Sequence, residues 1–118
     1  MTKHSLGMLG QEAAKQFLIG QGFGILKENY RLRSSEIDII AKDGDYVVFV
    51  EVKFRKGLSH GLPRESVGRA KQQRIIKAAM HYISARGQSE QDYRFDVVEV
   101  LEQDGKTFVN HIANAFWA

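Results

Sequence analysis

Hydrophobic residues recur along the chain at two spacings, which predict two helices and five strands. An apolar stripe at helical spacing over residues 7–19 predicts the first helix, and a second stripe predicts a helix from residue 64 or 65 to residue 86. Runs rich in Val, Ile and Phe predict the strands, at residues 25–32, 36–41, 46–54, 93–101 and 107–113. The predicted order is α-β-β-β-α-β-β, and the predicted fold class is α/β.

Two Asp-Gly dipeptides, at residues 43–44 and 104–105, predict two-residue hairpin turns. The strands on either side of the first turn are apolar on both faces, so we expect them to be central strands covered on both sides. The chain has 118 residues, of which 43% are hydrophobic and 26% are charged. This length and composition predict one domain spanning residues 1–118.

Several classes of function lack support in the sequence. No apolar stretch approaches the length of a membrane span, and the N-terminus has no apolar signal core, which predicts a cytoplasmic protein that does not associate with a membrane. The absence of cysteine excludes disulfides, zinc fingers and thiol catalysis. Any metal would therefore be held by oxygen or by the four scattered histidines, and a hard cation such as Mg²⁺ is the natural candidate.

Positive charge is concentrated in one segment of the chain. The whole chain has a net charge of +3, but residues 53–77 contain eight basic residues and one acidic residue, Glu65. The basic residues are Lys53, Arg55, Lys56, Arg64, Arg69, Lys71, Arg74 and Lys77. Such a patch attracts polyanions, so all of them except Lys53 are predicted to bind nucleic acid, with DNA as the expected partner. A solvated helix face that serves only solubility is the alternative.

The first predicted hairpin carries a group of charged residues with possible chemistry. A two-residue Asp-Gly turn places Glu36 opposite Glu51, and Asp38 one diagonal step from Glu51 on the same face. At roughly 7–8 Å between backbones, the carboxylates of Asp38 and Glu51 can reach one divalent cation, Mg²⁺ or Mn²⁺. Lys53 shares this face and would lower the cost of charge that develops during attack on a phosphodiester. A surface salt bridge between Glu51 and a neighbouring lysine is the alternative.

The order Asp38, Glu51-Val52-Lys53 resembles the PD-(D/E)XK signature of restriction-endonuclease-like nucleases. The chain is also similar to the YraN-like family of small bacterial proteins, through Gly22-Phe23, Ile25-Leu26-x-x-Asn29, Glu36-Ile37-Asp38-Ile39-Ile40-Ala41, Val50-Glu51-Val52-Lys53-x-Arg55 and Lys71-x-x-Arg74-Ile75. Members of that family are described as predicted nucleases and are related by fold to Holliday-junction resolvases. The resemblance implies a restriction-endonuclease-like three-layer core, in which helices flank a central mixed sheet.

The resemblance also implies a catalytic site and an activity. Asp38, Glu51 and the backbone carbonyl of Val52 would hold Mg²⁺, and Lys53 would orient or activate the attacking water. The implied activity is that of a metal-dependent endonuclease acting on DNA, including branched or damaged DNA. Paired cuts by so small a nuclease would need a homodimer.

The chain departs from the family pattern at the first helix. Gln11 stands where the resolvase-like relatives have a Glu, and an amide is a poorer Mg²⁺ ligand than a carboxylate. Glu12 is one residue away, about 100° around a helix. Gln11 and Glu12, with Glu36 and Lys71, are therefore the predicted accessory residues of the site. A non-catalytic nucleic-acid-binding or adaptor domain, with cleavage lost through Gln11, is the alternative function.

Lys71 falls within the apolar stripe of the second predicted helix, among residues expected to face the core. A lysine in that position is costly unless its amine reaches water or an anion. Either the side chain extends past the helix edge to solvent, or it points toward the carboxylate site and a bound phosphate.

Overall fold

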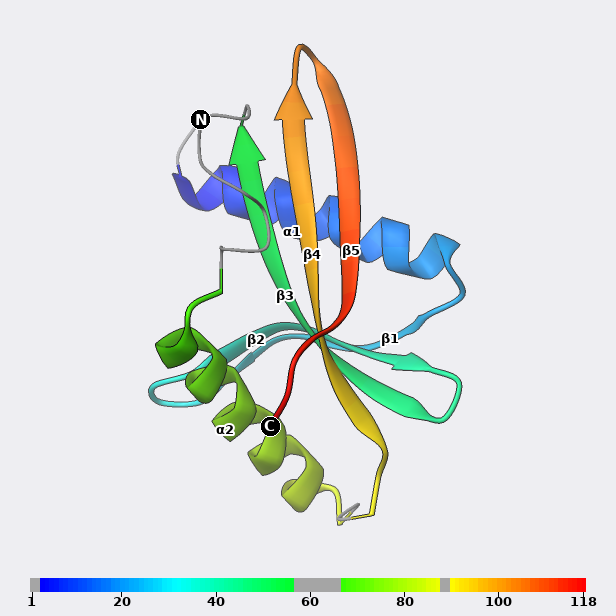
Figure 1. The fold of residues 1–118 in the computed structure, drawn as a ribbon, viewed down its shortest axis with the longest axis vertical. Coiled ribbons are helices and arrows are strands. Elements are labelled where there is room, and N and C mark those ends of the chain that lie inside the picture. The colour runs from blue at the N-terminus through cyan, green and yellow to red at the C-terminus, as the bar shows by residue number, and fades with distance from the viewer. Residues whose placement is uncertain (1–2, 57–66, 88–89) are drawn as a thin grey trace.

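The computed structural model describes residues 3–56, 67–87 and 90–118, which form two helices and one five-stranded sheet (Figure 1). The elements are α1 (Lys3–Gly20), β1 (Gly24–Arg31), β2 (Glu36–Asp43), β3 (Tyr46–Lys56), α2 (Arg69–Ala85), β4 (Tyr93–Gln103) and β5 (Lys106–Phe116). Their order along the chain and the α/β class confirm the prediction from sequence. Neither described helix is long and apolar enough to cross a membrane.

The sheet is mixed, and its strands lie in the order β1-β2-β3-β4-β5. Each neighbouring pair is antiparallel except β3 and β4, which run parallel from Val47 opposite Tyr93 to Lys56 opposite Glu102. Parallel neighbours need a long crossover connection, and α2 lies within the one that joins β3 to β4. The strand pairs β1–β2, β2–β3 and β4–β5 are adjacent in sequence.

A helix covers each face of the sheet, so the core has two parts. Under α2, the buried residues of the helix pack with Val47 and Phe49 of β3; they are Ile75, Ala78, Ala79, Tyr82 and Ile83. On the other face, Ala14 and Leu18 of α1 pack with Val48 and Val50 of β3. Successive residues of β3 thus face opposite helices. This confirms the expectation that β2 and β3 are central strands, and the layers are visible in Figure 1.

The first hairpin turn lies one residue later than predicted. Gly44 and Asp45 form the turn, and Asp43 pairs with Tyr46. Gly44 has a φ of 60°, which suits the first turn position of a type II′ hairpin. The predicted register was therefore wrong by two residues, a shift that leaves the paired residues, 39–43 and 46–50, on their predicted faces.

The second predicted helix starts later than expected, at Arg69. Gly68 precedes it in an extended conformation, with φ −74° and ψ 169°, and the preceding Val67 is also outside the helix. Residues 64–66 lie outside the described part of the chain. The apolar spacing nevertheless identified the buried face of α2 correctly, because the pattern continues through the helix to Ile83.

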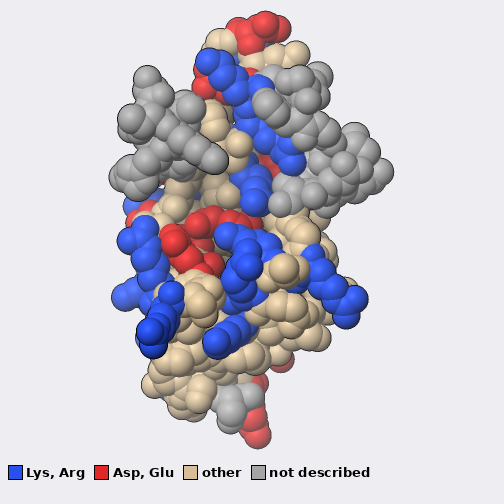
Figure 2. Space-filling view, turned by 90° about the vertical axis from the view of Figure 1, so that its left-hand side faces the viewer, with Lys and Arg blue, Asp and Glu red and all other residues tan. Residues whose placement is uncertain are grey.

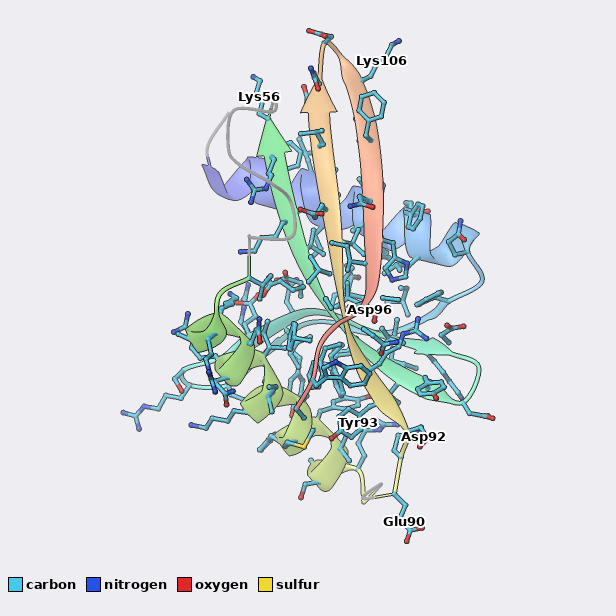
Figure 3. The ribbon with its side chains drawn as sticks, viewed as in Figure 1. Lys56, Glu90, Asp92, Tyr93, Asp96 and Lys106 are labelled. Atoms are coloured by element: carbon cyan, nitrogen blue, oxygen red, sulfur yellow. The ribbon has the colours of Figure 1, made fainter. Side chains whose placement is uncertain are left out.

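A buried polar group on β4 joins this strand to β5 directly and to β2 through Arg94. Asp96 is fully buried and accepts hydrogen bonds from His111 Nε2 at 2.7 Å, Arg94 Nε at 3.1 Å and the backbone N–H of Asn114 at 3.1 Å. Arg94 also forms an ion pair with Asp43 of β2 at 2.9 Å. Asp96 lies where the strands cross in the projection of Figure 3.

Candidate metal centre

The predicted carboxylates meet where β2 and β3 separate. The β2–β3 ladder ends at Ile39 opposite Val50. Asp38 and Glu51 are the next residues beyond this pair, and their carboxyl groups are within hydrogen-bond reach, closer than the diagonal position predicted from sequence. The backbone N–H of Val52 donates to Asp38 Oδ2 at 2.8 Å and so holds this carboxylate at the end of the ladder.

The prediction that Glu36 lies opposite Glu51 was wrong, because it followed from the incorrect turn. Glu36 pairs instead with Arg31 of β1, and the Arg31 Nε atom is 3.2 Å from Glu36 Oε2. Glu36 still lies beside the carboxylate pair, since it lines the same cavity as Asp38 and Glu51.

Local irregularity in β1 and β2 accompanies the separation of the strands. Ile37 and Ile40 are three residues apart, yet both belong to the core under α2. The alternation of β2 side chains between the two faces of the sheet is therefore interrupted between them, at Asp38. The pairing of β1 with β2 places Asn29 across from Asp38, and Asn29 has a φ of 53°. Asparagine tolerates this left-handed conformation better than most residues.

Glu51 is the most perturbed acid of the site. It is only 6% exposed, and burial, followed by a hydrogen bond and charge repulsion from Asp38, raises its pKa from 4.5 to about 8. The charges of Lys71 and Lys53 lower the pKa of Glu51 but do not offset these effects. Lys71 Nζ is 3.5 Å from Glu51 Oε2. Two adjacent carboxyl groups of this kind do not both ionise readily without a compensating cation.

A cavity of about 620 Å³ opens beside the pair. Acidic residues from four elements line it, namely Glu12, Glu28, Glu36, Asp38 and Glu51. Among the described residues that line the cavity, Arg31 is the basic one. Figure 2 shows acidic side chains gathered in the middle of one face, with Lys and Arg on either side. This charge distribution suits a cation in the cavity and an anion across its rim.

Gln11 and Glu12 both line the cavity, from the side of α1. Glu12 is exposed and accepts a hydrogen bond from Gln16 Nε2 at 3.0 Å, within a regular helix. The adjacent Gly10 lies against β3 so closely that a Cβ there would be 2.8 Å from Phe54 Cβ. This close approach places Gln11 on the part of α1 that borders the cavity.

The donor set fits a hard divalent cation. Within the described residues, no group of three or more His, Asp or Glu side chains is close enough to hold a metal ion. Beside the two carboxylates of Asp38 and Glu51, the cavity lining includes Val52 and Gln11, which carry neutral carbonyl and amide oxygens. Carboxylates and amide or carbonyl oxygens are the ligands that Mg²⁺ and Mn²⁺ take.

Lys53 lies beside the pair but not in the cavity lining. It is half-buried on β3, two residues after Glu51 and therefore on the same face, and in register with Glu99 of β4. Its charge is close enough to lower the pKa of Glu51. The catalytic role of Lys53 stays a prediction.

The residues predicted to bind nucleic acid are divided between two regions. Those on α2 are Arg69, Lys71, Arg74 and Lys77, all at least partly exposed. Lys56 ends β3, away from α2, and follows the half-buried Arg55 (Figure 3). Arg64 lies outside the described residues.

Three cavity residues from β1 were not predicted as part of the site: Glu28, Asn29 and Arg31. Glu28 binds Lys15 Nζ of α1 at 3.1 Å, which ties the strand to the helix. The available signal was the polar run in an otherwise apolar predicted strand. That run does not show which side chains face the carboxylates, because the conformation of Asn29 is not visible in the sequence.

Comparison with known proteins places the chain in a family. A UPF0102 protein of Desulforapulum autotrophicum is 48% identical over 114 residues, covering 97% of this chain and 94% of that protein. Relatives in Symbiobacterium thermophilum and Alkaliphilus metalliredigens are 46% and 45% identical, over at least 95% of each chain. A family model described as "Uncharacterised protein family UPF0102" matches residues 10–100, which include Asp38, Glu51 and Lys53. The YraN-like resemblance is thereby confirmed, and the chain belongs to the UPF0102 family.

Proposed function

We propose that the protein is a Mg²⁺- or Mn²⁺-dependent endonuclease that hydrolyses phosphodiester bonds in DNA. The observation that carries this proposal is the pair of the half-buried Asp38 and the buried Glu51, which line an acidic cavity beside Lys53 and Lys71. A mixed sheet with two carboxylates at the point where β2 and β3 separate also supports a restriction-endonuclease-like core related to the resolvases. Branched or damaged DNA is the proposed substrate, and a cytoplasmic homodimer is the assembly that paired cuts would need.

In this proposal each residue has a distinct task. Asp38, Glu51 and the Val52 carbonyl hold the cation, and the Val52 N–H fixes the orientation of Asp38. When bound, the cation supplies Lewis-acid polarisation of a phosphoryl oxygen and makes water more acidic. Lys53 orients the attacking water and stabilises negative charge that develops on the phosphate. Lys71 offsets the charge of Glu51 and presents a cation toward the phosphate.

Cation binding can be tested without cleavage, by calorimetric titration of Mg²⁺ and Mn²⁺. The intact protein should bind, whereas Asp38→Asn and Glu51→Gln should each lose most of the heat. Glu90→Gln removes an exposed carboxylate away from the cavity and is the matched control (Figure 3). Equal heats from all four proteins would remove the metal centre from the proposal.

Cleavage is tested on linear, flapped and four-way DNA with Mn²⁺. Lys53→Ala should abolish turnover with little loss of DNA binding, because Lys53 is assigned to the transition state. Lys42→Ala, which removes an exposed lysine from β2, should leave turnover intact. If the Lys53 variant cuts all substrates at the rate of the unaltered protein, the proposed role of Lys53 is wrong.

Gln11 favours a second candidate function, a nucleic-acid-binding or adaptor domain without cleavage. Its amide lines the cavity at the position where the resolvase-like relatives have a carboxylate. If the unaltered protein binds DNA but cuts no substrate, and Gln11→Glu restores cutting, the adaptor function is supported. Cutting by the unaltered protein would reject it.

A further inference from the structure

A second cavity, of about 300 Å³, lies next to the metal centre and has the opposite charge. The β1–β2 turn and the first turns of α2 form it; its charged residues are Arg31, Arg33, Glu36, Lys71 and Arg74. Four basic side chains and a single carboxylate therefore line this cavity. Glu36 is held by Arg31 Nε at 3.2 Å, which offsets its charge. The cavity thus favours an anion.

The polar groups of this second cavity suit phosphate oxygens. Ser34 and Ser35 also line it. Ser35 is only 8% exposed, and within the described residues its hydroxyl has no hydrogen-bond partner. A buried hydroxyl without a partner costs free energy that a bound acceptor would recover. Arginine and serine side chains are common partners of phosphate in protein–nucleic acid complexes.

The position of the cavity relates it to the proposed reaction. Arg31 and Glu36 line both cavities. Lys71 lines the second cavity while its amine is 3.5 Å from Glu51 of the first. A phosphate held among Arg33, Arg74 and Ser35 would therefore belong to a strand that also passes the carboxylate pair.

We propose that this second cavity binds one backbone phosphate of the nucleic acid, next to the phosphate that is cleaved. This inference rests on the proposed function for its ligand. It adds a direction for the substrate strand, which runs from the acidic cavity across the β1–β2 turn to the start of α2. Arg33, which the sequence pattern did not single out, and Ser35 become binding residues.

Phosphate binding is tested directly by amide-resolved NMR with inorganic phosphate, in EDTA. The amides of Arg33, Ser34 and Ser35 should shift in a saturable manner, and these shifts should be lost in Arg33→Ala/Arg74→Ala. They should persist in Asp38→Asn, since neither cation nor cleavage is involved. Absence of saturable shifts in the unaltered protein would overturn the proposal, even if the protein proves to be a nuclease. Saturable shifts in a protein that cleaves no DNA would support phosphate binding in this cavity and would contradict only the proposed nuclease activity.

The assignment to nucleic acid is tested by fluorescence anisotropy with duplex DNA at several salt concentrations. Two arginines that serve one phosphate predict that Arg33→Ala/Arg74→Ala flattens the slope of log K against log[salt] by about 0.9 and weakens binding about tenfold at about 0.1 M salt. Lys27→Ala/Lys106→Ala removes the same charge from exposed positions outside the cavity and should change the slope by less. Figure 3 labels Lys106.

Three results would overturn the assignment. A change of about 1.8 in the slope of log K against log[salt] would mean that the arginines contact two separate phosphates. An unchanged slope would mean that neither contacts DNA. If inorganic phosphate binds but does not compete with DNA, the cavity serves a free phosphate compound instead of a strand.

Discussion

Replacement of Glu51 by Gln should stabilise the metal-free protein at neutral and alkaline pH. Burial and the neighbouring Asp38 raise the pKa of Glu51 from 4.5 to about 8, so the folded protein holds this proton more tightly than the unfolded chain does. The corresponding stability is fully present below pH 4.5 and is lost as the pH rises to about 8. Gln keeps the shape of the protonated side chain and does not ionise.

The magnitude follows from the size of the shift. Each unit of pKa difference is worth about 1.4 kcal/mol. Between pH 5 and pH 8 the unaltered protein should therefore lose about 3 kcal/mol relative to Glu51→Gln from this group. The small exposed fraction of Glu51, 6%, means that solvent screens little of the effect.

The assay is urea unfolding in EDTA at several pH values from 5 to 8. The free energy of unfolding of Glu51→Gln should exceed that of the unaltered protein by an amount that grows with pH. Glu90→Gln, at an exposed carboxylate, should show no such growth. A constant difference across the pH range, or a variant less stable than the unaltered protein at pH 8, would refute the reasoning.

Three further predictions concern the packing and charges around this site. Burial opposes the ionisation of Asp96, but hydrogen bonds from His111, Arg94 and Asn114 lower its pKa. The ionised carboxylate therefore stabilises the folded protein above pH 3.8, and this contribution is lost on further acidification. Asp96→Ala should therefore lower the free energy of unfolding in urea by about 3 kcal/mol at pH 7 and by less in acid. An equal loss at the two pH values would contradict this prediction. Gly10→Ala should cost about 1–3 kcal/mol through the close contact with Phe54, whereas Gly20→Ala, with open space around it, should not; equal unfolding midpoints would refute the contact. Lys71→Gln should raise the pKa of Glu51 further, because it removes a charge that lowers it; carboxyl NMR measures this, and an unchanged value would show that the ion pair is absent in solution.

The carboxylate pair could be predicted from sequence because it depends only on the two-residue period of strands. The hairpin turn was placed one residue too early, and the register was wrong by two. Glu51 and Lys53 nevertheless stayed on one face, since an even shift preserves facing, and Asp38 lies next to Glu51 although the alternation of β2 is interrupted there. The error concerned their separation, and the structure brings Asp38 and Glu51 nearer than predicted.

The rest of the site depends on features without a sequence period. Asn29 has a positive φ, and its neighbours Glu28 and Arg31 line the cavity, but the hydrophobic pattern of the strand indicates neither. Gly68 extends the backbone before α2, so the helix begins at Arg69 although the apolar spacing starts earlier. These features depend on tertiary packing, which local propensity does not determine.

The close approach of Gly10 to Phe54 makes position 11 an unusual point for evolutionary change. The contact holds α1 close to β3 at the point where the next residue, Gln11, lines the cavity. Gln and Glu have nearly the same shape, so one exchange at this position alters the number of acidic groups while leaving the packing of α1 unchanged. A lineage of such proteins can therefore change the number of carboxylates in the cavity by one through a single substitution.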